Sequence, residues 1–179
     1  SAQTKIGYFD DQFVLSLFPG IQKIDTLLQS YSKDSLQEEY NWTLKQYQVQ
    51  DSVNRKDSVE LSKKPKALEM ATTELNKLKY KLINWQQYQQ EMLQQKQEAL
   101  LLPYRQKIYE ALSEVVKENK YTLVLRSEVL SPYVTPSLAD NLAIRTAIKL
   151  KLPVPKDYMD AFNAAIGVAP AAKPAAPKK

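Results

Sequence analysis

The sequence predicts a mainly α protein with a small β part, an α+β fold in which a long antiparallel helical hairpin projects from a small body. Three observations support this fold class. The 179 residues contain only three glycines, and none lies between Gly20 and Gly167. Two long windows, 20–64 and 66–102, contain no proline and are rich in helix-forming residues. Short alternating segments, which are typical of strands, flank this helical region on both sides.

The composition excludes several kinds of site. Cysteine and histidine are both absent, so disulfides, thiol nucleophiles, Cys/His zinc sites and triads that use imidazole cannot be built. The scarcity of glycine argues against a Gly-rich loop that binds phosphate. The adjacent carboxylates at 10–11 and 38–39 do not face each other on a helix, and they make poor acid–base pairs. We therefore expect no enzymatic activity, no metal ion and no cofactor.

The N-terminal segment predicts a strand at the start of a soluble chain. Residues 4–9 alternate, with Ile6 and Tyr8 on one face. No run approaches the eighteen or so apolar residues that a membrane span requires. A short start, residues 1–4, directly before an apolar strand also suits a mature chain whose secretion signal has been removed.

The two proline-free windows predict a helical hairpin. The first window begins with apolar residues in 3–4 spacing, and the second keeps a heptad rhythm from Leu68 to Ala99. At 1.5 Å per residue, helices over about 21–62 and 66–119 would be roughly 60 and 80 Å long. A compact chain of this size has a radius of gyration of only ~16 Å. The helices are therefore expected to pair, with one turn near residues 63–66 that Pro65 supplies.

Two further expectations concern the geometry of this hairpin. A turn centred near 63–66 sets Trp42 opposite Gln87 and near Trp85, so that the two tryptophans pin the arms together. Pro103 falls inside the second helical stretch, but the apolar pattern resumes at Ile108. We therefore expect a kinked helix at this proline and not a helix end.

Strand signals return after the helical region, over residues 121–126. Three residues of this segment share one face: Tyr121, Leu123 and Leu125. A third short strand is predicted over 128–134, where Pro132 confines it to an edge or a bulge. A helix begins near residue 137, and residues 153–166 hold a short amphipathic turn.

This order of elements predicts a body made from sequence-distant segments, 1–20 and 104–152, and a hairpin over 21–103. Residues 153–179 form a C-terminal extension that is disordered from about 167. Three strands and two short helices bury little surface alone, so we expect several copies to close a barrel from their strands. The predicted core of the body and oligomer consists of Ile6, Tyr8, Tyr121, Leu123 and Leu125.

Two blocks of the sequence carry a family resemblance. The first runs from Lys5 to Asp10 and continues with Val14-Leu15 and Pro19; the second runs from Pro103-Tyr104 to Leu125. In this order and spacing they are similar to the Skp/OmpH family of periplasmic chaperones, over roughly residues 4–150. The resemblance implies a trimeric β-barrel body with three helical tentacles around a cavity that holds unfolded outer-membrane proteins without ATP. It also implies a periplasmic location.

The sequence departs from the family pattern in three places. Lys120 stands where the family commonly has glycine, and Pro132 interrupts the third strand. The resemblance offers nothing for residues 153–179, which serve either as a docking segment or as a linker.

Charge is uneven along the hairpin. Residues 21–62 carry five basic and seven acidic groups, whereas residues 63–96 carry seven basic and three acidic groups. One interpretation is a solvated helix face. The other is a basic surface that steers acidic unfolded polypeptides or anionic lipid headgroups. The candidate contact residues are Lys63, Lys64, Lys66, Lys77, Lys79 and Lys81.

The function predicted from residues and resemblance together is that of an ATP-independent holdase, a chaperone that binds unfolded outer-membrane proteins and prevents their aggregation. The alternative is a structural coiled-coil scaffold that binds one folded partner at the hairpin tip. Nucleic-acid binding is not expected, because four arginines and a net charge of +5 fall short of the charge density of phosphate-tracking surfaces.

Overall fold

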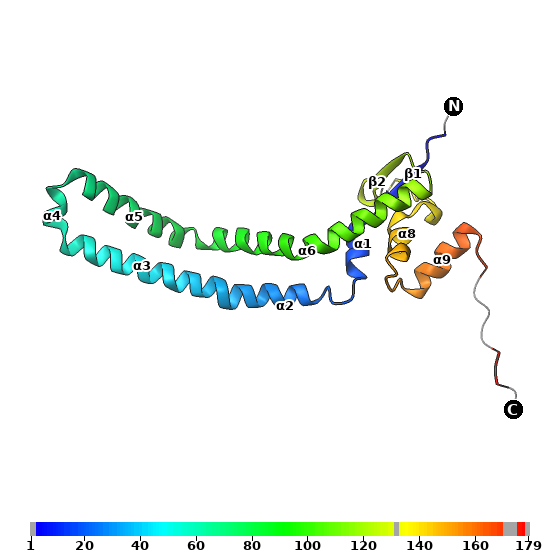
Figure 1. Ribbon diagram of the computed structural model, residues 1–179, viewed down its shortest axis with the longest axis horizontal. Coiled ribbons are helices and arrows are strands. Elements are labelled where there is room, and N and C mark those ends of the chain that lie inside the picture. Colours follow the sequence, from blue (N-terminus) through cyan, green and yellow to red (C-terminus); the bar gives the residue numbers. More distant parts are fainter. Residues whose placement is uncertain (1–2, 131–132, 170–174, 178–179) are drawn as a thin grey trace. The chain divides into compact units, whose positions relative to one another are not determined.

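The structure is a computed structural model and describes residues 3–130, 133–169 and 175–177. The chain divides into two compact units, one formed by residues 22–101 and one formed by the two ends, 1–21 and 102–179 (Figure 1). The described residues are 74% helical and include one two-stranded parallel sheet. This confirms the predicted class, mainly α with a small β part and a long antiparallel helical hairpin. The barrel and the trimer concern several copies and stay predictions.

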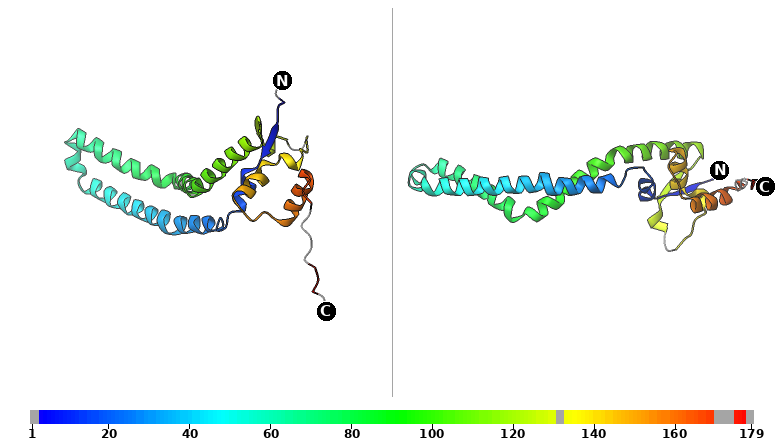
Figure 2. Two further views of the ribbon diagram at one scale, coloured as in Figure 1. Left: turned by 45° about the vertical axis from the view of Figure 1, so that its right-hand side comes forward. Right: turned by 90° about the horizontal axis from the view of Figure 1, so that it is seen from below.

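Residues 22–101, the hairpin unit, consist of two helical arms. The first arm joins α2 (Lys23–Ser30), the π-helical turn η1 (Tyr31–Leu36) and α3 (Gln37–Lys56). The returning arm consists of α5 (Pro65–Ile83) and the first part of α6 (Trp85–Glu118). In both views of Figure 2 the arms of this unit run side by side. Pro103 lies inside α6, so the expectation that the helix continues through this proline is confirmed.

The reversal between the arms contains a short helix of its own, α4 (Ser58–Ser62). The α3 helix ends at Asp57, and the chain leaves helical geometry again at Lys64, where φ is −128° and ψ is 85°. Pro65 then occupies the first position of α5, where its fixed φ is favourable and its missing N–H costs nothing. The reversal therefore spans 57–64 and begins several residues before the predicted turn.

The predicted pairing of the two tryptophans is wrong. Trp85 packs against Tyr40, with ring centroids 5.2 Å apart, and against Tyr88 at 5.0 Å. The Trp42 side chain is 58% exposed. Because α4 takes up extra residues in the reversal, the arms pair about one helical turn away from the register that a turn at 63–66 sets.

In the unit formed by the chain ends, the body, a parallel sheet holds the two ends together. Strand β1 (Ile6–Phe9) pairs with β2 (Leu123–Arg126) in the register Ile6↔Leu123 to Phe9↔Arg126. Parallel strands require a long crossover connection, and here the whole helical hairpin lies between them in the sequence. Just before the strands, the Lys5 amide donates to the Thr122 hydroxyl at 2.9 Å.

Helices cover this sheet and supply the core of the body. Asp10 caps α1 (Asp11–Ser16) by accepting from the Phe13 amide, and Asn141 caps α8 (Leu142–Lys149) in the same way. The short 3-10 turn η2 (Leu138–Asp140) precedes α8. The largest fully buried apolar side chains of this unit come from α1, α6 and α8: Val14, Ile108, Leu142 and Ile144.

Within one chain, the strand residues that were predicted to form the core are not the ones that are buried. Gly7 and Phe9 are buried, whereas Ile6 is 45% and Leu123 is 46% exposed. The reason is α8, whose Leu142 side chain packs directly over Gly7. Tyr8 and Leu125 are half-buried, and of the five predicted core residues only Tyr121 is buried in the single chain.

The prediction of a third strand over 128–134 is wrong for the residues that are described. Residues Ser127–Leu130 form a short helix, α7, and Ser131 and Pro132 lie outside the described residues. Tyr133 and Val134 are exposed. A strand needs a hydrogen-bonding neighbour, and among the described residues only β1 and β2 form a sheet.

The C-terminal extension forms more structure than the predicted short turn. Helix α9 (Lys156–Ile166) buries Phe162, whose ring lies 5.2 Å from the Arg145 guanidinium, and the rings of Tyr158 and Phe13 are 5.3 Å apart. The helix ends at Gly167, which adopts the left-handed conformation with φ 81°. The disorder predicted from about 167 falls mostly on residues 170–174 and 178–179, which lie outside the described residues.

Substitution of Gly7 by alanine is expected to destabilise the body. A Cβ at this position would lie 2.5 Å from Leu142 Cδ1 and 2.7 Å from its Cγ. Overpacking of this kind costs about 1–3 kcal/mol. Urea denaturation followed by far-ultraviolet circular dichroism measures this loss. The control is Thr4→Ala at a nearby exposed position, and equal midpoints for the two variants would contradict the close packing of α8 on β1.

Candidate functional site

The first arm of the hairpin carries an apolar stripe on its outside. Trp42, Val49 and Val53 are all exposed, and their spacing of seven and four residues places them on one face of α3. The face of α3 that meets the returning arm is a different one. It includes buried Thr43, and Asn54, whose amide donates to the Ala71 carbonyl of α5 at 3.2 Å. The stripe is therefore not used to hold the two arms together.

The reversal and the returning arm also expose large apolar side chains. Met70 of α5 is 69% exposed. Three other residues of these segments are exposed to a similar degree: Val59, Tyr80 and Ile83. Single exposed apolar residues are normal on any protein, but here they recur along both arms of a two-helix unit. The hairpin thus offers several exposed apolar contacts spread along both arms.

The structure separates the six candidate lysines into three groups. Lys63, Lys64 and Lys66 are exposed together at the reversal, and Lys63 lies 3.7 Å from Glu60. Lys77 and Lys79 are exposed on α5, where Lys77 pairs with Glu74 at 3.3 Å. Exposed pairs three residues apart are weak and leave the ammonium accessible to other anions. Lys81, the sixth, is half-buried between the arms.

Lys81 belongs to a polar cluster that sequence reasoning missed, here called the Glu39 cluster (Glu39, Lys81 and Tyr88). Glu39 Oε1 accepts from Lys81 Nζ at 2.8 Å and from the Tyr88 hydroxyl at 2.6 Å. The Lys81 ammonium also lies 4.7 Å from the Tyr88 ring centroid. The partners are 42 and 49 positions from Glu39 in the sequence, so only the register of the arms could have revealed them.

The pKa values follow from these contacts. Burial opposes ionisation of Glu39, but the hydrogen bonds from Lys81 and Tyr88 outweigh it and lower the pKa of this carboxyl below its ordinary value. The hydrogen bond to Glu39, followed by burial, raises the pKa of Tyr88 to about 12. At neutral pH the cluster is therefore a carboxylate that accepts from an ammonium and from a neutral phenol.

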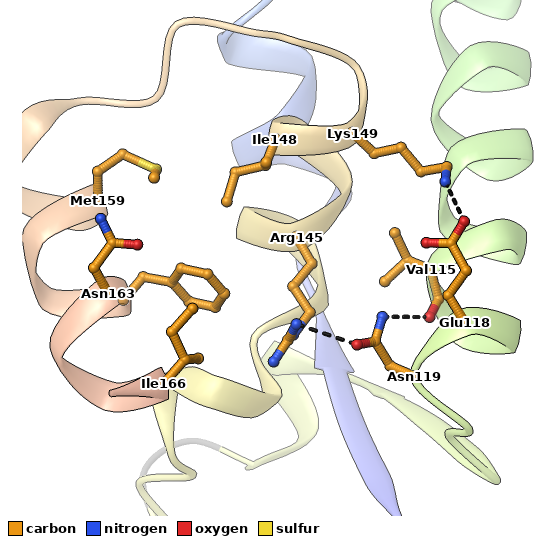
Figure 3. A pocket seen from close by; sticks show the side chains of 10 residues that line it. Val115, Glu118, Asn119, Arg145, Ile148, Lys149, Met159, Asn163 and Ile166 are labelled. Carbon is orange, nitrogen blue, oxygen red and sulfur yellow. Dashed lines mark hydrogen bonds and ion pairs between the residues drawn. The ribbon is translucent and has the colours of Figure 1, made fainter. Parts of the chain in front are cut away.

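The body contains a cavity of about 510 Å³ between the end of α6, α8 and α9 (Figure 3). Several of its polar side chains form hydrogen bonds or ion pairs. Arg145 Nη1 donates to Asn119 Oδ1 at 3.2 Å, and Lys149 pairs with Glu118 and Glu114. Ile148, Met159 and Ile166 supply apolar walls. The cavity shows no arrangement of nucleophile and base that would perform catalysis.

The described residues also bear on metal binding and on membrane crossing. They contain no group of three or more acidic, histidine or cysteine side chains that could hold a metal ion. Among the same residues, none of the helices combines the length and the apolar character that crossing a membrane requires.

The described residues thus form a paired helical hairpin with exposed apolar and basic side chains, inserted in the sequence between two parallel strands of a small body. A family model described as outer membrane protein (OmpH-like) matches residues 5–139. The chain belongs to this OmpH-like family, and the resemblance to the Skp/OmpH family is confirmed. A search of curated proteins gave no match.

Membership has a consequence for function. The family is one of chaperones and not of enzymes, and it supports a chaperone kind of function that concerns outer-membrane proteins. The match ends before α8, so α8 and α9 lie beyond the part of the chain that the family model covers.

Proposed function

We propose that this protein is an ATP-independent holdase of the periplasm, which binds unfolded outer-membrane proteins in a cavity between the hairpins of a homotrimer. The observation that carries the proposal is the apolar stripe on α3, Trp42, Val49 and Val53, whose side chains are 44–58% exposed. Exposed apolar surface on a rigid helix is suited to an unfolded chain, which presents apolar side chains in no fixed order. Many shallow contacts of this kind give affinity while the bound chain stays mobile.

The homotrimer is supported by the outward face of the sheet. Ile6 and Leu123 lie opposite each other in the register and are both about half exposed, with Tyr8 and Leu125 as the next pair on the same face. A two-stranded sheet is marginal alone, and exposed strand edges favour pairing with another chain. Burial of these four side chains between copies would add an apolar contact to the core that each chain already has.

The exposed lysines have a second role in this proposal. Lys63, Lys64 and Lys66 at the reversal, with Lys77 and Lys79 on α5, attract acidic segments of unfolded proteins or anionic lipid headgroups over a distance that salt shortens. Lys81 forms an ion pair with Glu39 of the opposite arm. It therefore stabilises the hairpin and is not part of this basic surface.

An aggregation assay tests the proposal. A urea-unfolded β-barrel membrane protein is diluted into buffer without nucleotide, with and without the chaperone, and light scattering is followed. We expect the unsubstituted protein to suppress scattering and a Trp42→Ser, Val49→Ser, Val53→Ser variant to lose most of this protection, because its apolar contacts are removed.

The matched control replaces exposed polar residues of the same helix, Asn41→Ser and Gln48→Ser, and is expected to protect as the unsubstituted protein does. Equal protection by the stripe variant would remove the stripe from the proposal. No suppression by the unsubstituted protein, together with binding of one folded partner in fixed stoichiometry, would favour the scaffold function instead.

A further inference from the structure

The returning arm of the hairpin is interrupted once within the hairpin unit, at Asn84. Helix α5 ends at Ile83 and α6 begins at Trp85, and Asn84 adopts φ −97° and ψ 20°. The Asn84 side-chain amide donates to the Tyr80 carbonyl at 3.0 Å, so this side chain bonds to a main-chain acceptor near the end of α5. In the right-hand view of Figure 2 the returning arm changes direction along its course, while the first arm runs nearly straight.

The first arm also contains an irregular turn, which contacts the part of α6 that follows Asn84. The π-helical turn η1 ends at Leu36, three residues before Glu39. Side chains join it to the part of α6 just beyond the interruption: Gln89 donates to the Ser32 hydroxyl at 3.1 Å, and the Lys96 ammonium lies 5.3 Å from the Tyr31 ring centroid. Irregular turns of this kind occur where helices bend.

Glu39 bridges the interruption from the opposite arm. Its Oε1 atom accepts from Lys81, three residues before Asn84, and from Tyr88, four residues after it. One carboxylate oxygen of α3 therefore holds the end of α5 and the start of α6 at the same time. Bonds with one ionised partner are stronger than neutral ones, and all three groups are partly shielded from water.

The next residue of α3 reinforces this bridge. Tyr40 packs its ring against Trp85, the first residue of α6, and Trp85 in turn contacts Tyr88. The aromatic contacts fix only the α6 side of the interruption. Lys81 of α5 contacts the Tyr88 ring of α6 directly, and Glu39 is the residue of the opposite arm that holds both of them by hydrogen bonds.

We propose that Glu39 is a positioning residue that fixes the angle between α5 and α6 and thereby sets the spacing of the two arms of the hairpin. At this junction the Asn84 amide donates to the Tyr80 carbonyl at 2.9 Å and the Asn84 carbonyl accepts from the Tyr88 amide at 3.1 Å. The two helices therefore meet through a single residue, and without Glu39 we expect them to pivot there. A second consequence, that this spacing sets how large an unfolded protein the hairpins can enclose, rests on the proposed function.

The experiment measures the angle directly. The chain has no cysteine, so Thr73→Cys on α5 and Gln95→Cys on α6, both at exposed positions, place two spin labels on either side of Asn84. Labelled chains are mixed with an excess of unlabelled chains. Double electron–electron resonance spectroscopy then gives the distribution of distances between the two spin labels. The unsubstituted hairpin is expected to give one narrow distribution.

Glu39→Ala is expected to give a distribution roughly twice as broad, because a helix junction without its side-chain restraint pivots. Glu39→Gln keeps an acceptor oxygen and is expected to restore the narrow distribution in part. The control Glu38→Gln changes the exposed neighbouring carboxylate and is expected to change nothing. A narrow, unshifted distribution for Glu39→Ala, with unchanged helix content by circular dichroism, would overturn the proposal.

If Glu39→Ala reduces the helix content, Tyr88→Phe replaces it in the same measurement. This variant keeps the ring and removes only the hydroxyl that binds Glu39, so it is expected to broaden the distribution less than Glu39→Ala, and an unchanged distribution would again contradict the proposal. Client binding is measured separately. A broader distance distribution without a change in the size of the clients bound would contradict the second consequence only. Failure of the unsubstituted protein to bind any client would contradict the proposed function and leave the role of Glu39 intact.

Discussion

Replacement of Leu123 by aspartate is expected to convert the proposed homotrimer into single chains and to abolish the proposed protection of unfolded clients. Leu123 is 46% exposed within one chain and lies opposite Ile6 on the outward face of the sheet. The charge therefore stays hydrated in a single folded chain but would be buried without a partner in an interface, at a cost of several kcal/mol. Light scattering on a size-exclusion column gives the mass, and the aggregation assay gives the activity.

The conservative variant Leu123→Ile serves as the control. It replaces one apolar side chain by another of the same size that is β-branched and suits a strand, so it is expected to keep both mass and activity. Circular dichroism establishes that the aspartate variant is folded. An aspartate variant with the mass of the unsubstituted protein would show that this face is not the contact between copies.

Replacement of Phe162 by alanine is expected to release α9 from the body. Phe162 is 3% exposed and lies against Arg145, so truncation leaves an empty space beside a guanidinium that has lost its ring contact. Truncation of a buried phenylalanine costs roughly 3–5 kcal/mol. Both tryptophans lie in the hairpin unit, so their fluorescence would not report the loss.

Amide hydrogen exchange measured by mass spectrometry resolves the effect by segment. Residues of α9 are expected to lose most of their protection, and α3 of the hairpin is expected to keep its own. Ile166→Ala, at the more exposed end of the same helix, is the control and should produce a much smaller change. Full protection of α9 in the Phe162 variant would contradict its role as the anchor.

Local signals in the sequence predicted the hairpin well. Absence of proline over 20–64 and 66–102, the heptad rhythm and Pro65 are properties of neighbouring residues, and they were sufficient to predict two arms and one reversal. The resumption of the apolar pattern at Ile108 likewise predicted that α6 continues through Pro103. Each of these features depends on the propensity and spacing of residues within a single helix.

Features that depend on distant contacts were missed. Alternation alone cannot tell which face of β1 is covered, and the packing of Leu142 over Gly7 decides it. The register of the arms depended on α4, a single helical turn of Ser58–Ser62 inside the reversal. The Glu39 cluster forms because of that register. Helix α9 packs on the body because Phe162 lies against Arg145 of α8. In each case the deciding partner is remote in the sequence.

The most direct test of the central claim is the mass of the complex with an unfolded client. The protein alone, and then with a urea-diluted β-barrel membrane protein, is passed over a size-exclusion column with multi-angle light scattering and no nucleotide. We predict three times the chain mass of 20.5 kDa for the protein alone, and that mass plus one soluble client chain after mixing. The mass of a single chain, with the client lost to aggregation, would contradict the holdase.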